Sequence, residues 1–234
     1  MIRALVFDFD GLILDTETSV YEAWRIVYEE HDQVLPKDRW LKRIGTDGSG
    51  FDPLAELCER VGETLDAEKI RSRRMAFHRA HIAKLDQMPG VRACLEYARA
   101  KSIGTAIASS SPNDWVSGHI ERLGLAHFFD EVVTAEQVEA AKPAPDLYLR
   151  ATELLGVDPA DAIALEDSPN GVESAKAAGL FCVAVPGPMT RTLSFHAADA
   201  ILASLDTRPA GEWIAEAAAA RRERHADQPV SSLR

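Results

Sequence analysis

The sequence predicts an α/β fold, a doubly wound parallel sheet with a helical module inserted after its first strand. Two observations lead to this prediction. Short apolar runs alternate with helical patterns over most of the chain, which is typical of parallel sheets with crossover helices. One long segment near the N-terminus contains helical patterns only and interrupts the alternation. With 234 residues, 46% of them hydrophobic, the chain can bury the core that such a fold needs.

The predicted strands are short and apolar. They cover residues 2–7, 103–109, 130–135, 161–166 and 180–186. Helical patterns such as GVRACLEYARAK and APDLYLRATELLGV lie between them. From about residue 16 to 84 we expect helices only, with a flexible glycine-rich loop at 45–51, and the alternation resumes at 88–91.

This pattern divides the chain into three parts. Residues 1–15 and 86–207 form the predicted α/β core, and residues 16–85 form the inserted helical cap. Residues 208–234 are rich in alanine at first, which predicts a C-terminal helix that fades into a disordered end.

The composition limits the kind of partner. Acidic residues outnumber basic ones by 37 to 26 and give a formal charge of −11, so a nucleic-acid partner is not expected. A small anionic substrate needs only a local cation. Three distant cysteines, an odd number, indicate reduced core residues. No apolar run approaches the ~20 residues that span a bilayer, and no signal sequence is evident, so we expect a cytoplasmic monomer without membrane contact.

The first predicted strand ends in two acidic residues, within the stretch ALVFDFDGLILDTE. Asp8 and Asp10 are two residues apart, so their side chains point to the same side at the carboxyl edge of the sheet, where doubly wound folds bind ligands. Two carboxylates so close repel one another unless one holds a proton or a divalent cation lies nearby. The first arrangement separates an ionised group from a proton donor, and the second suits magnesium. Taken alone, the motif could also be a solvated surface turn.

Three further polar features follow other predicted strands. They are the serines 109–111, Lys142 before two prolines, and the pair Glu166 and Asp167. Each has a structural alternative, namely a serine helix cap, a solvated lysine, and acids that favour a helix N-terminus. Each could instead act on a phosphate or a cation. The occurrence of all four strand-linked features together favours a shared site.

Together these motifs resemble those of the haloacid dehalogenase (HAD) superfamily, over residues 3 to about 186. The stretches DGLILDTE, KPAPDLYL and LEDSPNG are similar to the β-phosphoglucomutase-like phosphatase branch in particular. The resemblance implies a Rossmann-like core in which the first strand is central, between the strands that carry Ser109 and the pair Glu166 and Asp167.

The resemblance also implies roles for the motif residues. Asp8 would be the nucleophile that forms an aspartyl-phosphate, and Asp10 the general acid and base. Mg²⁺ would be held by Asp8, the backbone carbonyl of Asp10 and Asp167, with Glu166 acting directly or through a water. The phosphate-binding residues would be Ser109, Ser110 and Lys142.

The cap is expected to close over the site and contact the leaving group. Candidate substrate residues are Thr16, Glu17, Asn113 and Arg74, of which Thr16 is expected to cap a helix. Trp24 is expected in the core, and the histidines, including His78 and His81, are expected at the surface or in the core.

We therefore expect a magnesium-dependent phosphatase that hydrolyses a small phosphorylated metabolite, such as a sugar phosphate. A β-phosphoglucomutase-type mutase is the main alternative. That family carries a cap histidine and a cap-loop arginine, where this chain has Val20 and the loop GTDGSG, so hydrolysis is favoured. The dehalogenase branch displaces a halide, needs no acid for the leaving group and lacks a second aspartate, so the presence of Asp10 disfavours dehalogenation. Phosphonoacetaldehyde hydrolysis through Lys37 or Lys42 and a non-catalytic binding protein are minor alternatives.

Overall fold

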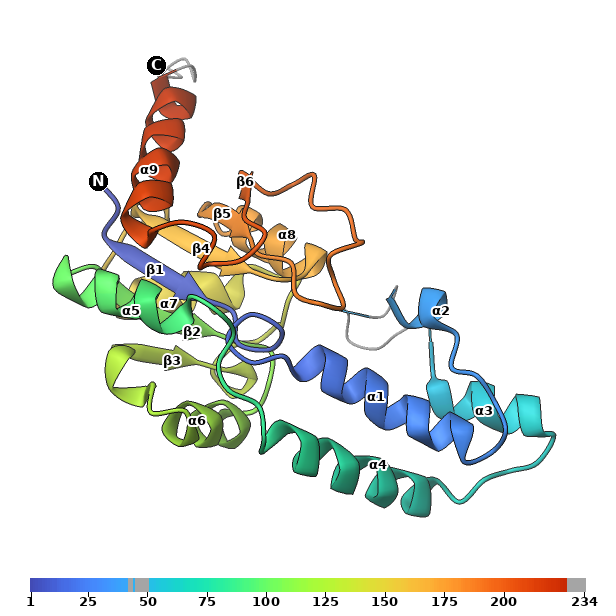
Figure 1. Ribbon diagram of the computed structural model, residues 1–234. Coiled ribbons are helices and arrows are strands. Elements are labelled where there is room, and N and C mark those ends of the chain that lie inside the picture. Colours follow the sequence, from blue (N-terminus) through green and yellow to red (C-terminus); the bar gives the residue numbers. More distant parts are fainter. Residues whose placement is uncertain (42–43, 45–50, 227–234) are drawn as a thin grey trace.

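The computed structural model describes residues 1–41, 44 and 51–226. Six parallel strands form one sheet in the order β3-β2-β1-β4-β5-β6 (Figure 1). Their bounds are β1 Ala4–Phe7, β2 Gly104–Ala108, β3 Glu131–Val133, β4 Ala162–Glu166, β5 Phe181–Ala184 and β6 Ala200–Ile201. The predicted central position of the first strand, between β2 and β4, is confirmed.

Two apolar layers cover the sheet. The helices α5 (Val91–Ala100), α6 (Asn113–Arg122) and α9 (Ala210–Ala226) pack on the face that receives Leu5 and Phe7 of β1. The helices α7 (Asp146–Leu154) and α8 (Pro169–Ala177) pack on the other face, against Ala4 and Val6. Successive residues of β1 thus point to opposite faces, and all four are fully buried, as expected for the centre of a doubly wound sheet.

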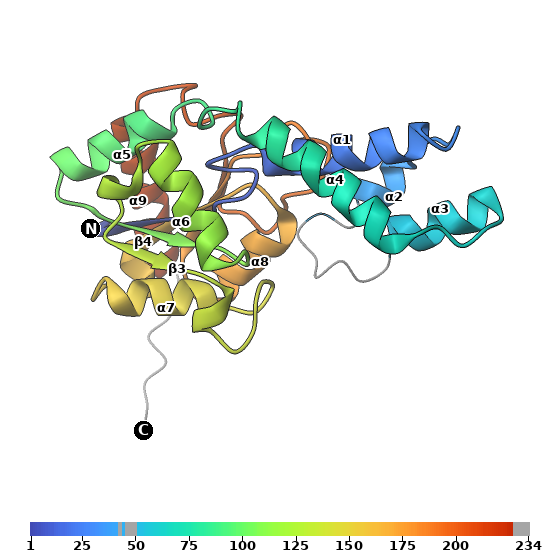
Figure 2. The same cartoon turned by 90° about the horizontal axis from the view of Figure 1, so that it is seen from below.

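The helices that the structure describes between β1 and α5 form a separate group beside the carboxyl edge of the sheet (Figures 1 and 2). We call them the cap helices: α1 Thr16–Glu29, α2 Lys37–Leu41, α3 Pro53–Val61 and α4 Ala67–Ile82. They bury a cluster that includes Trp24, as expected, and Tyr28 and Trp40, and that Met189 of the core joins. Aspartates 15, 52 and 66 accept backbone N–H bonds at the starts of α1, α3 and α4, which explains where these helices begin.

The predicted α/β fold with a helical insert is confirmed, with corrections at the margins. Strand β6 was not predicted, because two residues with one exposed side chain give no periodic signal. Short 3₁₀ helices, Ala126–Phe128, Ala135–Gln137 and Pro159–Asp161, were also not predicted. Loop residues 45–50 and the tail 227–234 lie outside the described residues, and the domain bounds stay a prediction. Within the described part of the chain, no helix has the length and apolar character needed to cross a membrane.

Candidate active site

Asp8 and Asp167 come together just past the ends of the two central strands. The backbone N–H of Asp8 donates to the carbonyl of Leu165 (2.9 Å), which extends the pairing of β1 with β4 by one residue. Gly11 then turns the chain with a φ of +88°, a region that favours glycine. A Cβ at Gly11 would lie 2.1 Å from Oδ2 of Asp167, so glycine also makes room for this carboxylate.

Three buried carboxylates form the floor of the site. Asp8, Glu166 and Asp167 each offer an oxygen, and these oxygens lie within 4.8 Å of one another. The exposed fractions of the three residues are 7%, 0% and 2%. Clustered carboxylate oxygens are the ligands that hard divalent cations prefer, so this group could hold a metal ion. The side chain of Asp10 is not part of the cluster.

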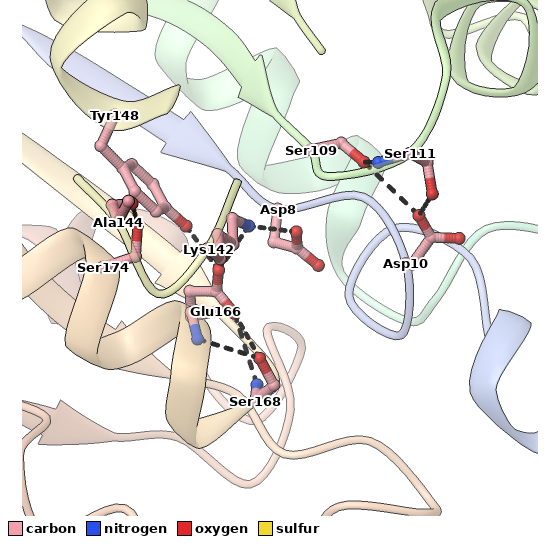
Figure 3. A network of polar contacts seen from close by, with 11 residues as sticks. Asp8, Asp10, Ser109, Ser111, Lys142, Ala144, Tyr148, Glu166, Ser168 and Ser174 are labelled. Atoms are coloured by element: carbon pink, nitrogen blue, oxygen red, sulfur yellow. Dashed lines mark hydrogen bonds and ion pairs between the residues drawn. The ribbon is translucent and has the colours of Figure 1, made fainter. Parts of the chain in front are cut away.

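Lys142 lies among these carboxylates. Its ammonium forms ion pairs with Asp8 and with Oε1 of Glu166, the latter at 2.6 Å (Figure 3). Glu166 is held further by the hydroxyl of Tyr148, which donates to Oε1 (2.6 Å), and by the N–H and hydroxyl of Ser168, which donate to Oε2 (both 3.3 Å). A Cβ at Gly171 would lie 1.9 Å from Oε1, so this glycine lets α8 approach the carboxylate.

Burial and charge shift the protonation of the cluster. Burial raises the pKa of the Asp8 carboxyl to about 8, and the Lys142 ammonium offsets only part of this effect. Burial, reinforced by Asp8 and Glu166, raises the pKa of Asp167 well above its usual range. Burial alone would lower the pKa of Lys142, but the two carboxylates outweigh it, and this pKa is raised. One ammonium therefore does not compensate three carboxylates, and a bound divalent cation would favour their ionised forms.

Asp10 points away from this cluster, toward the loop after β2 (Figure 3). Its Oδ2 accepts from the hydroxyl of Ser111 (2.6 Å) and more weakly from Ser109 (3.4 Å), and its Oδ1 accepts from the indole N–H of Trp115 (3.0 Å). No serine side chain caps α6, so that alternative was wrong. The hydroxyls of Ser109 and Ser111 are engaged by Asp10, whereas Ser110 is exposed.

A cavity of about 590 Å³ lies between the strand ends and the cap helices. Its lining includes Asp8, Asp10, Ser109, Ser110, Lys142 and Asp167 from the core, and Thr16, Glu17, Val20, Ile44, Arg74 and His78 from the cap. Most of the predicted site residues therefore share one cavity. Asn113 and Lys37 are not among the residues that line it, and Lys42 lies outside the described part of the chain.

The prediction that Thr16 caps a helix is wrong. Asp15 caps α1 instead, with its Oδ1 accepting from the N–H of Thr18 (3.1 Å), because it occupies the position before the first helical residue. The Thr16 hydroxyl is buried, lines the cavity, and has no hydrogen-bond partner among the described residues. Such an oxygen is available to a ligand.

Three residues that shape the site were not predicted from the sequence, namely Tyr148, Trp115 and His78. Tyr148 contacts Glu166 from the first turn of α7, and KPAPDLY alone does not reveal that contact. Trp115 is four residues after Ser111 and lies near the start of α6. This closeness in sequence to the serines could have indicated a place beside the site. The histidines were expected at the surface or in the core. His78 is buried, in agreement with the second of these, but it also lines the cavity.

This fold and this arrangement of strand-end residues define a class of α/β hydrolases with a helical cap. The sequence model of the haloacid dehalogenase-like hydrolases matches residues 5–185, and the chain belongs to this family. The resemblance stated from the motifs is thereby confirmed.

Three relatives illustrate the similarity. YhcW of Bacillus subtilis is 45% identical over 205 residues, covering 88% of this chain and 93% of YhcW. A phosphorylated carbohydrates phosphatase of Thermotoga maritima is 35% identical, covering 76% of this chain and 82% of that protein. The β-phosphoglucomutase of Bacillus subtilis is 30% identical, covering 79% and 83%.

Proposed function

We propose that this protein is a magnesium-dependent phosphatase that hydrolyses a small phosphorylated metabolite, most simply a sugar phosphate, in the cytoplasm and as a monomer. The observation that carries the proposal is Asp8 at the floor of the cavity, paired with Lys142 and beside Asp167. The similarity to a phosphatase of phosphorylated carbohydrates supports the substrate class.

The residues present fit a magnesium ion. Asp8, Asp167 and the backbone carbonyl of Asp10 would hold it, while Glu166, whose oxygens already accept from Lys142 and Ser168, would act through Lys142 or a water. When bound, the ion would supply positive charge to the transferring phosphoryl group. The uncompensated carboxylates of the cluster favour this occupancy.

The proposed reaction has two steps on the protein's own groups. An oxygen of Asp8 attacks phosphorus, the ester P–O bond breaks, and Asp10 gives a proton to the departing alcohol oxygen. Asp10 then takes a proton from a water that attacks the aspartyl-phosphate, which releases inorganic phosphate and restores Asp8. Lys142 neutralises the phosphoryl oxygens next to Asp8. Ser110 and Ser109 position these oxygens, and the Ser109 hydroxyl leaves its weak bond to Asp10 (3.4 Å) to do so.

The cap side of the cavity would select the alcohol part of the substrate. The Thr16 hydroxyl offers a hydrogen bond, and Glu17 offers an acceptor for sugar hydroxyls. Arg74 lines the same wall, with its guanidinium 5.5 Å from the ring centre of Trp24, and would attract an anionic substrate. We propose these as the contacts that distinguish phosphorylated metabolites.

A mutase is the second candidate, favoured by the similarity to a β-phosphoglucomutase. Hydrolysis remains the first, because Val20 stands where that family has a histidine. The test compares, with magnesium, phosphate release from a panel of sugar phosphates with conversion of β-glucose 1-phosphate to glucose 6-phosphate in the presence of catalytic bisphosphate. Dominant release that Asp8→Asn abolishes supports the phosphatase, whereas faster isomerisation makes the protein a mutase. Normal release by Asp8→Asn would exclude Asp8 as the nucleophile.

A further inference from the structure

Trp115 joins the proton-transfer carboxylate to the cap helices. Its indole N–H donates to Oδ1 of Asp10 at 3.0 Å. Its ring lies against the imidazole of His78 of α4, with the ring centres 5.4 Å apart and the planes 14° from parallel. We infer that Trp115 is a positioning residue for Asp10 and that His78 of the cap fixes Trp115. This inference rests on the proposed acid and base role of Asp10.

The hydrogen bonds of Asp10 explain why one N–H matters. Ser111 and Ser109 hold Oδ2, whereas Trp115 is the donor to Oδ1. Donors on a single oxygen leave the carboxyl group able to rotate about that contact. A donor on each oxygen fixes both the position and the plane of the group, and proton transfer depends strongly on such alignment.

Trp115 is itself held on two sides. His78 covers its face, and His119 of its own helix meets it edge-on, with ring centres 4.4 Å apart and planes at 77°. His78 is only 5% exposed, and its Nδ1 shares a hydrogen bond with the hydroxyl of Ser19 in α1 (3.0 Å). Burial, with a contribution from Arg74, lowers the pKa of His78 to about 4, so the imidazole is neutral near pH 7.

The cap therefore contacts the reacting centre at two places with different roles. Thr16 and Arg74 face the cavity, where they can touch a substrate. His78 lines the same cavity and, together with Ser19, also reaches Asp10 through Trp115, as a chain of contacts that runs from α1 and α4 to α6. This second connection lets cap packing set the efficiency of proton transfer.

The test compares esters that differ in their need for an acid. Glycerol 2-phosphate releases an alkoxide that requires protonation, whereas p-nitrophenyl phosphate releases a stable phenolate. Measured with Mg²⁺, kcat/KM reports the steps up to alcohol release. Trp115→Phe keeps a ring and removes the N–H. We expect it to lower kcat/KM about 10-fold for glycerol 2-phosphate and at most about 3-fold for p-nitrophenyl phosphate.

Trp213→Phe is the matched control. Trp213 is buried in α9, away from the cavity, and its indole N–H has no partner among the described residues, so this change removes packing volume alone. A loss that is equal for the two esters in Trp115→Phe, or one no larger than that of Trp213→Phe, would overturn the inference.

His78 provides the test from the cap side. His78→Ala removes the stacked ring and should lower kcat/KM for glycerol 2-phosphate about 3-fold, whereas His78→Phe restores a ring and should return it to within about 2-fold of the parent. The double variant of Trp115→Phe with His78→Ala should lose no more than Trp115→Phe, since both act on one contact. Should Trp115→Phe not fold, the His78 pair decides, and equal rates for Ala and Phe would refute the inference.

Asp10→Asn separates this inference from the function on which it rests. If Asp10→Asn loses activity equally on both esters, the acid role of Asp10 fails, and the inference fails with it. If Asp10→Asn shows the ester-dependent loss but Trp115→Phe and His78→Ala do not, the proposed function stands and the role of Trp115 is refuted.

Discussion

Replacing Lys142 by methionine tests the charge balance of the site. The lysine side chain is 8% exposed and is paired with Asp8 and Glu166, whose side chains are 10% and 0% exposed. Removing one partner of a buried ion pair costs about 3–5 kcal/mol, because a charge is left without compensation. We expect the free energy of unfolding of Lys142→Met to fall by about 3 kcal/mol at pH 7 without divalent cations.

The loss should grow with pH, and the sign follows from Asp8. Its pKa of about 8 is raised above the unfolded value, so its protonated form contributes stability that is lost as pH rises toward 8. Without Lys142 this pKa rises further, and the native variant keeps a proton that the native parent has released. Above pH 8 the difference between the two proteins should therefore widen by about 1.4 kcal/mol per pH unit.

Urea unfolding at pH 7, 8 and 9 with a chelator measures these differences. Arg150→Met is the control, since Arg150 pairs with Glu153 in an exposed position where little stability is at stake. Added Mg²⁺ should narrow the gap between Lys142→Met and the parent, because the ion compensates the same carboxylates. A loss below about 1 kcal/mol at every pH, or a gap that shrinks as pH rises, would refute the proposed charge balance.

Two further predictions concern the metal and its surroundings. Gly11→Ala should lose about 1–3 kcal/mol of stability and weaken Mg²⁺ binding, because a Cβ there meets Asp167 and φ is positive. Gly156→Ala, with a positive φ and open space, is its control in thermal unfolding, and equal losses would contradict the steric argument. The Mg²⁺ dissociation constant should rise at least about tenfold from pH 7 to pH 6, because binding displaces the proton of Asp8, and pH-independent calorimetric affinity would count against this.

The meeting of Asp8, Glu166 and Asp167 could be predicted from the sequence because it depends on strand ends. Parallel strands bring their carboxyl ends to one edge, so residues just after β1 and β4 become neighbours once these strands pair. Lys142 lies beyond the end of β3 (Glu131–Val133) rather than directly after it, so strand pairing alone did not place it beside Asp8. In the structure, Lys142 joins the carboxylate cluster through its ion pairs with Asp8 and Glu166.

The contacts between cap and core could not be predicted in this way. Helical periodicity indicates which face of α4 is apolar, but not which core residue meets His78, since that depends on how two separately packed layers lie together. The prediction that Thr16 caps α1 was wrong for a local reason. Asp15 and Thr16 are both good capping residues, and a shift of one position in the helix start decides which of them caps and which faces the cavity.

The charges of the site determine what an anionic substrate would meet there. Lys142 is shared by two carboxylates, and the hydroxyls of Ser109 and Ser111 are turned toward Asp10. Few donors of the core are thus left for a phosphate, and the clustered carboxylates repel it. A divalent cation on Asp8 and Asp167 would reverse the sign of the local field. The same carboxylates that could hold the metal therefore make phosphate binding depend on it, and Arg74 of the cap would attract the substrate from the opposite wall.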